Sequence, residues 1–391
     1  MQYSQRMQKV QPSATLTINA KATELKAQGH QILNLAAGEP DFQPPEHVQQ
    51  AVHQAVKEGL TRYTAAAGLP ELLEAVAGYF QKFYGIQARQ DMAIVSNGGK
   101  HALYNLFQVL LNPGDEVLIP APYWVSYPDM VSLADGVPVI VPTSPENQFL
   151  MQVQDLQNKL TPRSKILVLN SPSNPTGCHY SQEQLDSILQ YALDQGLFVI
   201  SDEVYDQLVY APAQPCSAAG WLQSYPEQIA VVNGLSKTFA ITGWRVGFVL
   251  SAPGLCKLLA KLQGQSTSNI CVLAQKAALA ALNGSFDFLD THRQHLASKR
   301  DLALEHLADW PGVQCPRPDG AFYLFPRMSE YMGGHIQDST ALCSYLLEEA
   351  KVATVPGVAF GDDSCLRFSY ATDQETLLQG LDQVKSALQQ L

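Results

Sequence analysis

Three apolar runs of this 391-residue chain each lead into polar side chains that could take part in catalysis. These side chains are Asn174, after the run 166–169, Asp202 and Tyr205, after the run 197–200, and Lys237, after the run 229–232. The carboxyl ends of parallel strands line the ligand crevice of an α/β sheet, so we expect these groups to meet at one rim. An amide, a carboxylate, a phenol and an amine would then face one small molecule.

The cofactor pyridoxal 5′-phosphate requires this combination of groups. A lysine, here Lys237, bonds covalently to its aldehyde, and a carboxylate, here Asp202, keeps its pyridine nitrogen protonated so that the ring accepts electrons. Donors to the phenolate oxygen of the ring, here Asn174 and Tyr205, tune that covalent bond toward reactivity at neutral pH. An aromatic face such as that of Trp124 or Tyr123 can stack on the ring.

The phosphate of this cofactor requires backbone N–H groups at the start of a helix. The segment 95–103 supplies a strand end, the glycine turn Gly98-Gly99 and a helix that includes Lys100. We therefore predict that this turn binds the phosphate.

Each of these features has another interpretation when it is taken alone. Asp202-Glu203 also resembles the magnesium-binding acidic pair of nucleotide hydrolases, and a single lysine such as Lys237 is usually a surface charge. A nucleotide-binding loop would need Gly-x-x-x-x-Gly-Lys-Ser/Thr, of which the segment 234–238 supplies only the last part. The joint occurrence of the groups, in this order, favours pyridoxal phosphate.

The elements that must position these residues follow an alternating pattern. Short apolar runs alternate with stretches of helical period, which is typical of strands joined by crossover helices in a largely parallel sheet. The runs are 92–95, 117–119, 137–141, 166–169, 197–200, 229–232 and 246–250. As one crossover, Ser181 can cap a helix that continues to Gln195 and ends at Gly196. The pattern predicts an α/β protein.

The chain is longer than one hydrophobic core usually serves, so we expect a large domain and a smaller one. After about residue 285 the pattern changes to a long polar helix at 292–307, followed by short strands and helices. The N-terminal residues lack a strand run that belongs to the large sheet. We predict a large domain at 45–285 and a small α+β domain formed by 1–44 together with 286–391.

The composition excludes several classes of protein. A formal net charge of -11 repels nucleic-acid backbones and anionic membranes, and we find no basic patch that would offset it. No window approaches eighteen uninterrupted apolar residues, and the N-terminus lacks an apolar targeting segment. The seven cysteines are scattered without a Cys-x-x-Cys pair, which argues against zinc or redox chemistry. We expect a cytoplasmic protein that binds no metal, nucleic acid or membrane.

The same residues resemble the class I aminotransferases of fold type I, close to the bacterial aspartate aminotransferase branch, over nearly the full length. The matching motifs are Gly38-Glu39-Pro40-Asp41-Phe42, Arg62-Tyr63-Thr64, Asn97-Gly98-Gly99-Lys100, 122–128, Asn174-Pro175-Thr176-Gly177, 201–205, 236–247 and 366–371. The resemblance implies a three-layer α/β fold with a mainly parallel large-domain sheet. It also implies a pyridoxal phosphate enzyme that works as a homodimer.

Carried over residue by residue, the resemblance implies a set of contacts. At the cofactor it implies Lys237 as the bonded lysine and proton carrier, Asp202 at the pyridine nitrogen, Asn174 and Tyr205 at the phenolate oxygen, and Trp124 on the ring. At the phosphate it implies the backbone amides of Gly98, Gly99 and Lys100 together with Arg245. Tyr63 would reach the phosphate of the neighbouring subunit. Arg367 would hold the substrate α-carboxylate as a bidentate pair, with Gly38, Trp124 and Asn174 close to it.

The substrate side chain is less well defined by the sequence. The region 264–269 contains no arginine that could read a distal carboxylate from the partner subunit. In the branch that this chain resembles, a lysine at the position of Lys100 is associated with that task; alternatively, Lys100 only offsets the phosphate charge. Acceptance of prephenate is associated with a lysine where this chain has Gln11.

From these features we expect transfer of an amino group between L-aspartate, or a related L-amino acid, and 2-oxoglutarate by a ping-pong mechanism. Oxaloacetate is a second candidate acceptor. Three alternatives stay open: an aromatic or prephenate aminotransferase, a pyridoxal phosphate β-lyase of the same fold, and a non-catalytic binding domain.

Overall fold

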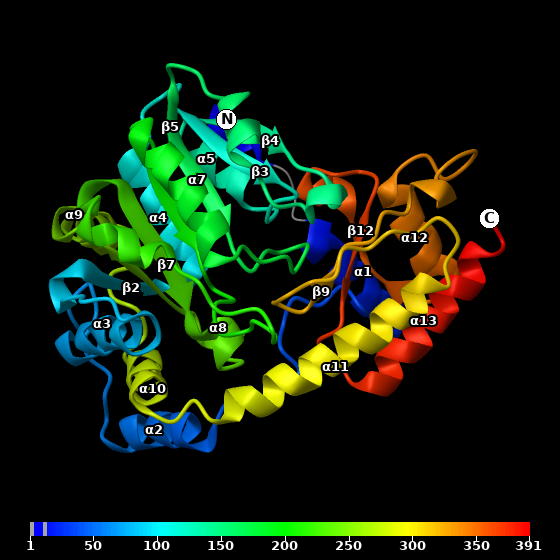
Figure 1. Ribbon diagram of the computed structural model, residues 1–391. Helices are drawn as coiled ribbons and strands as arrows, with labels where there is room; N and C mark the ends of the chain where they lie inside the picture. Colours follow the sequence, from blue (N-terminus) through cyan, green and yellow to red (C-terminus); the bar gives the residue numbers. More distant parts are fainter. Residues whose placement is uncertain (1–3, 11–13) are drawn as a thin grey trace.

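The computed structural model describes residues 4–10 and 14–391, and its largest element is a seven-stranded sheet (Figure 1). Its strands are β2 (Ala93–Asn97), β3 (Glu116–Ala121), β4 (Val137–Pro142), β5 (Ser164–Asn170), β6 (Phe198–Asp202), β7 (Ile229–Gly234) and β8 (Val246–Ser251), in the order β2-β8-β7-β6-β5-β3-β4. β8 pairs antiparallel with β2 and β7, and the other four strand pairs are parallel. All seven predicted strands and the mainly parallel arrangement are confirmed.

Helices cover both faces of this sheet. Those around it are α2 (Glu46–Lys57), α3 (Pro70–Tyr84), α4 (Gly99–Leu110), α5 (Tyr127–Leu133), α6 (Val153–Gln157), α7 (Gln182–Asp194), α8 (Leu235–Thr238), α9 (Pro253–Gly264) and α10 (Val272–Asn283). On β5, Leu167 packs in the core shared with α3, α7 and α10, whereas Ile166 packs in the core shared with α4, α5 and α9. Strands buried on both faces need continuous apolar runs, which explains why they were visible in the sequence.

The predicted crossover helix is α7. The Ser181 hydroxyl accepts a 3.2 Å hydrogen bond from the backbone of Gln184, and the Gln184 side chain accepts one of 2.9 Å from the backbone of Ser181. This reciprocal pair satisfies two N–H groups that the first helical turn leaves without intrahelical partners. The helix ends at Asp194, and Gly196 follows with φ 77°, a left-handed conformation that glycine adopts without strain.

The second group of elements joins the two ends of the chain. It contains α1 (Ala14–Ala27), β1 (Leu33–Asn34), α11 (Phe288–Ala308), β9 (Tyr323–Leu324), α12 (Ser339–Glu349), β10 (Val352–Ala353), β11 (Val355–Pro356), β12 (Leu366–Ser369) and α13 (Gln374–Leu388). β1 pairs in parallel with β10, and β11, β12 and β9 form an antiparallel sheet. The predicted long polar helix is α11, which extends from beside α2 to α13 (Figure 1).

Short 3₁₀ helices fill the connections between these elements. They are η1 (Gln5–Lys9), η2 (Gln90–Met92), η3 (Pro145–Asn147), η4 (Ala218–Gln223), η5 (Pro226–Gln228), η6 (Thr242–Trp244), η7 (Ser329–Tyr331) and η8 (Gly357–Phe360).

Candidate active site

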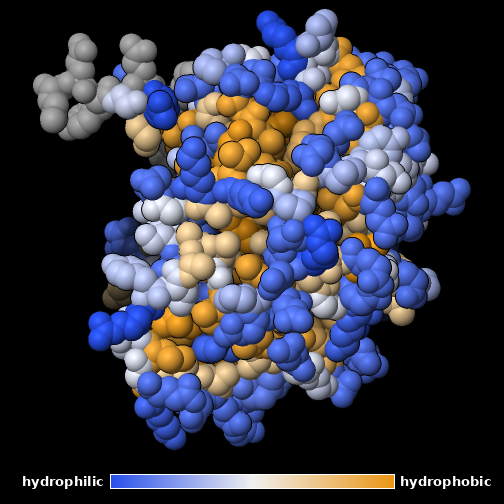
Figure 2. Space-filling model, turned by 90° about the vertical axis from the view of Figure 1, so that its left-hand side faces the viewer, coloured by the Kyte–Doolittle hydropathy of each residue, from blue (hydrophilic) through white to orange (hydrophobic). Residues whose placement is uncertain are grey.

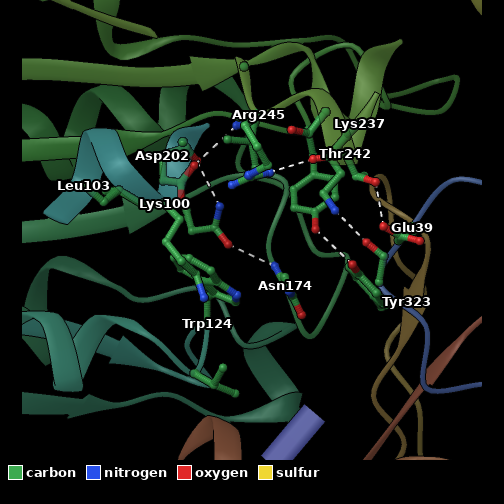
Figure 3. A pocket seen from close by; sticks show the side chains of 18 of the residues that line it. Glu39, Lys100, Leu103, Trp124, Asn174, Asp202, Lys237, Thr242, Arg245 and Tyr323 are labelled. Carbon is green, nitrogen blue, oxygen red and sulfur yellow. Dashed lines mark hydrogen bonds between the residues drawn. The ribbon is translucent and has the colours of Figure 1, made fainter. Parts of the chain in front are cut away.

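A cavity of about 450 Å³ lies at the carboxyl ends of β5, β6 and β7 (Figure 3). Ten of the twelve predicted site residues line it: Gly38, Gly99, Lys100, Trp124, Asn174, Asp202, Tyr205, Lys237, Arg245 and Arg367. The strand ends therefore converge as the sequence predicted. The cavity also receives β12 and the segment before α2, so residues from both groups of elements meet there.

Lys237 lies in α8, directly after β7. Its Nζ donates a 2.5 Å hydrogen bond to the carbonyl oxygen of Gly38. Burial lowers the pKa of Lys237 to about 8, partly opposed by the negative charge of Glu39. A neutral amine, which is the nucleophilic form, is therefore available near neutral pH.

Asp202 ends β6 and is buried. One carboxylate oxygen accepts a 2.6 Å hydrogen bond from the hydroxyl of Tyr127, and the other accepts a 3.4 Å bond from the backbone of Val204. Burial raises the pKa of Asp202 to about 6, and the hydrogen bond from Tyr127 opposes this rise. The carboxylate is thus ionised at neutral pH and can face a cationic ring nitrogen.

Arg367 reaches the cavity from β12 and is buried. Its Nη1 donates to the side-chain oxygen of Asn174 at 2.9 Å, and its Nη2 donates to the carbonyl oxygen of Ala36 at 2.8 Å. The guanidinium carbon lies 4.5 Å from the ring centre of Tyr323. Within the described residues, Nε has no hydrogen-bond partner and no carboxylate forms an ion pair with Arg367. A buried guanidinium without a counter-ion fits a substrate carboxylate.

A second cationic region lies at the start of α4. A Cβ atom on Gly98 would come within 2.3 Å of Nη2 of Arg245, so only glycine leaves room for the guanidinium at this turn. Burial lowers the pKa of Lys100, and the like charge of Arg245 lowers it further. The Lys100 Nζ lies 5.0 Å from the ring centre of Trp124. Two cations beside a helix N-terminus fit a phosphate group.

Two predicted residues do not line the cavity. Gly98 packs directly against the guanidinium of Arg245, which leaves no room for a Cβ atom at this residue. Tyr63 is 91% exposed on the surface, where it is free to contact another molecule but not the cavity of its own chain. Gln11 lies outside the described residues.

The comparisons with known proteins identify the family. Residues 30–384 match the family model "Aminotransferase class I and II". The chain belongs to this family. It is 41% identical to an aspartate aminotransferase of Bacillus subtilis, with 98% of both chains covered, and 41% identical to a probable aspartate/prephenate aminotransferase of Aquifex aeolicus, with 99% of this chain and 98% of the other covered. The structure of the Thermus thermophilus aspartate aminotransferase with maleate superimposes with a TM-score of 0.93 at 41% identity, over 99% of this chain and 100% of the other.

These findings confirm the predicted family, the fold type I architecture and the aminotransferase class. Several residues of this aminotransferase's cavity were not singled out from the sequence. The hydroxyl groups of Tyr323 and Tyr205 share a 2.9 Å hydrogen bond, and the Thr242 hydroxyl donates a 2.5 Å hydrogen bond to the Glu39 carboxylate. Glu39 and Thr242, which line the cavity, and Tyr127, which bonds Asp202, lie inside motifs of the resemblance, whereas nothing in the sequence around Tyr323 suggested a site.

The described residues also bear on the expectations for metal sites, membrane-spanning helices and cysteines. In residues 4–10 and 14–391, no group of His, Cys, Asp and Glu side chains is arranged to hold a metal ion. No helix of this described part is long and apolar enough to cross a membrane. All seven cysteines are free thiols, and only Cys271 is exposed.

Proposed function

We propose that this aminotransferase moves the amino group between L-aspartate, or a related L-amino acid, and 2-oxoglutarate, with pyridoxal 5′-phosphate as its cofactor. The observation that carries the proposal is the convergence of the Lys237 amine, the Asp202 carboxylate and the Arg367 guanidinium in one cavity. Within the described residues this guanidinium has no counter-ion, and its Nε has no hydrogen-bond partner. The names of the similar proteins support aspartate. The similar Thermus thermophilus structure is that of an aspartate aminotransferase with maleate, which is a dicarboxylate like aspartate.

Each part of the cofactor has a matching group in the cavity. Asp202 would face the pyridine nitrogen, Asn174 and Tyr205 the phenolate oxygen, Trp124 the ring face, Lys237 the aldehyde, and Gly98, Gly99, Lys100 and Arg245 the phosphate. When bound, the cofactor supplies an electron-withdrawing ring that stabilises negative charge at the substrate Cα. The raised pKa of Asp202 stays low enough for a carboxylate at neutral pH, as that position requires.

The residues of the chain then perform the following steps. Arg367 pairs with the substrate α-carboxylate through its guanidinium and orients the Cα–H bond. The Lys237 amine, released from the aldehyde when the substrate amine takes its place and with its pKa lowered to about 8, would accept the proton from the substrate Cα at Nζ and carry it within the cavity. The bound cofactor would hold the amino group between the two half-reactions, and Arg367 and Lys237 would serve the second oxo acid in the same roles.

Lys100 is proposed to read the distal carboxylate of aspartate. Its ammonium group lines the cavity beside Trp124. Burial and Arg245 lower the pKa of Lys100, and the negative charge of Asp129 opposes this only in part, so a bound carboxylate would favour the charged form further. A contact with the distal carboxylate is made by dicarboxylate substrates alone, so removal of Lys100 lowers their turnover more than that of other substrates. This property separates the proposed role from simple support of the phosphate.

Other reactions of the same fold stay open as alternatives. The Aquifex relative is named for aspartate and prephenate, which keeps a prephenate or other aromatic substrate in view, although this chain has Gln11 where a lysine is associated with prephenate. A β-lyase would use the same lysine. A non-catalytic binding domain is disfavoured by the family match and by the neutral amine available at Lys237.

The proposal extends to the assembly of the protein. We propose a cytoplasmic homodimer in which Tyr63 of each subunit contacts the cofactor phosphate of the other, and a division into a large domain at 45–285 and a small one at 1–44 and 286–391. The exposure of Tyr63 supports the dimer, and hydrophobic residues lie among hydrophilic ones on the face that carries α3 and α9 (Figure 2). The seven-stranded sheet lies wholly within 45–285.

The experiment is a single half-reaction. The purified protein is loaded with pyridoxal phosphate and mixed with a panel of L-amino acids without an acceptor, and the absorbance of the bound cofactor is followed. Aspartate and glutamate should convert it fastest. Failure of every amino acid to convert the cofactor, or an undiminished rate in Lys237→Ala, would contradict the proposal.

A further inference from the structure

Gln263, in the last turn of α9, is buried and uses every hydrogen-bonding position of its side-chain amide. Its oxygen accepts from Oγ of Ser96 at 2.7 Å and from Nδ2 of Asn105 at 3.3 Å. Its nitrogen donates to the carbonyl oxygens of Ala66 at 2.7 Å and Val95 at 2.9 Å. Carbonyl oxygens only accept hydrogen bonds, so they fix the orientation of the amide.

Two of these partners, Ser96 and Ala66, belong to segments with proposed functions. Ser96 begins the segment 96–100, which we call the phosphate turn because it contains the glycine pair before α4. Ala66 belongs to the segment 60–69, which carries Tyr63. We call this segment the arm loop because Tyr63 is proposed to reach the partner subunit. The Gln263 side chain therefore bonds the phosphate turn at its oxygen and the arm loop at its nitrogen.

Gln275, in the first turn of α10, bonds the arm loop and the carbonyl oxygen of Ile270, at 3.0 Å, but not the phosphate turn. Its nitrogen donates to the hydroxyl of Thr64 at 2.9 Å, and its oxygen accepts from the backbone of Leu69 at 2.8 Å. The arm loop is thus fixed to the body of the subunit at Thr64, Ala66 and Leu69, while the Tyr63 side chain is almost fully exposed. A rigid loop that presents an exposed aromatic ring is preorganised for contact with another molecule.

We propose that Gln263 is a positioning residue that couples the phosphate turn of its own subunit to the arm loop that serves the partner subunit. The inference rests on the proposed function, which assigns the phosphate to this turn and Tyr63 to the partner's pocket. A phosphate group that orders the turn also orders Ser96, and the planar amide of Gln263 passes this order to Ala66. Phosphate binding in the pocket of one subunit therefore orders Tyr63 of that subunit, which contacts the pocket of the partner subunit.

The experiment measures backbone hydrogen exchange of the cofactor-free protein with and without inorganic phosphate. In the wild type, phosphate should slow exchange in both the phosphate turn and the arm loop. Gln263→Met keeps the length of the side chain and removes all four hydrogen bonds. Without phosphate, the backbone amides of the phosphate turn and the arm loop should therefore exchange about tenfold faster than in the wild type. In this variant, phosphate should no longer slow the arm loop.

Two further variants separate coupling from general loosening. Gln275→Met should speed exchange in the arm loop and leave the phosphate turn unchanged, because Gln275 does not contact the turn. Ser96→Ala removes only the bond between the turn and Gln263, so phosphate should still slow the turn but have a weaker effect on the arm loop. Ser96→Ala tests the coupling even if Gln263→Met does not fold.

The inference is overturned if phosphate slows the arm loop equally in the wild type, Gln263→Met and Ser96→Ala. It is also overturned if phosphate slows the wild-type turn and leaves its arm loop unchanged. Either result in a protein that converts aspartate would contradict the coupling and leave the proposed function standing. A wild type that converts no amino acid would contradict the proposed function instead.

Discussion

The Tyr127 hydroxyl donates a 2.6 Å hydrogen bond to the Asp202 carboxylate, and both groups are buried. This bond favours the ionised carboxylate against the effect of burial, which raises the pKa of Asp202 to about 6. The rings of Trp124 and Tyr127 also meet edge to face, with centres 5.3 Å apart. One short segment therefore supports the carboxylate and supplies the aromatic face of the cavity.

Tyr127→Phe should move the acid limb of the pH profile of kcat/KM for aspartate to higher pH. Loss of one hydrogen bond to a buried carboxylate corresponds to about half to one pH unit. The matched control is Tyr225→Phe, since the Tyr225 hydroxyl contacts only Gln190 and Asp194 at the surface. An acid limb that stays in place in Tyr127→Phe would show that this bond does not set the pKa of Asp202.

Asp202→Asn should stabilise the cofactor-free protein most at high pH. The folded-state pKa of about 6 exceeds the ordinary 3.8, so the folded protein binds this proton more tightly and wild-type stability falls as the pH rises through about 6. Asparagine removes this dependence. The advantage of the variant in the free energy of unfolding, measured by urea titration, should shrink by about 1 kcal/mol between pH 8 and pH 5. An advantage that is constant or grows toward pH 5 would contradict the raised pKa.

The Lys237 amine should react with a small acylating reagent at a rate that rises through pH 8 and then levels. The reason is its pKa, which burial lowers from 10.5 to about 8. Competitive labelling of the cofactor-free protein, followed by peptide mass spectrometry, gives this profile, with the exposed Lys159 labelled in parallel as a reference. A Lys237 profile that still rises above pH 10 would argue against a neutral amine at working pH.

Arg367→Lys should lower kcat/KM about 10- to 100-fold for every amino acid substrate, because lysine keeps the charge and loses the planar fork. The α-carboxylate is common to all substrates, so aspartate and an aromatic amino acid should lose equally. Steady-state kinetics with both substrates checks this expectation. A loss confined to aspartate would assign Arg367 to the distal carboxylate instead.

Lys100→Ala should lower kcat/KM for aspartate at least about tenfold more than for an aromatic amino acid, since only aspartate has a distal carboxylate. Lys100→Arg, which keeps the charge, is the matched control and should retain most of the preference for aspartate. Equal losses with both substrates, together with faster loss of the cofactor on dialysis, would assign Lys100 to the phosphate alone.

The sequence by itself determined the elements and the identity of the main cavity groups. β5, β6 and β7 are buried on both faces, so they appear as continuous apolar runs, and Asn174, Asp202 and Lys237 follow them closely enough to be placed at one rim. The start of α4 was predicted for a similar reason, because the glycine pair 98–99 lies between an apolar run and a stretch of helical period. Local patterns suffice where the chain itself brings the residues together.

The tertiary structure decided the contacts that join distant segments. Gln263 bonds Ser96, Ala66 and Val95 across 167, 197 and 168 residues of sequence, and no local pattern marks it. The support of Asp202 by Tyr127 and the unpaired Nε of Arg367 likewise depend on which side chains burial leaves within reach. Apolar periodicity reports which face of an element is buried, but not which polar group on another element will satisfy a buried amide or carboxylate.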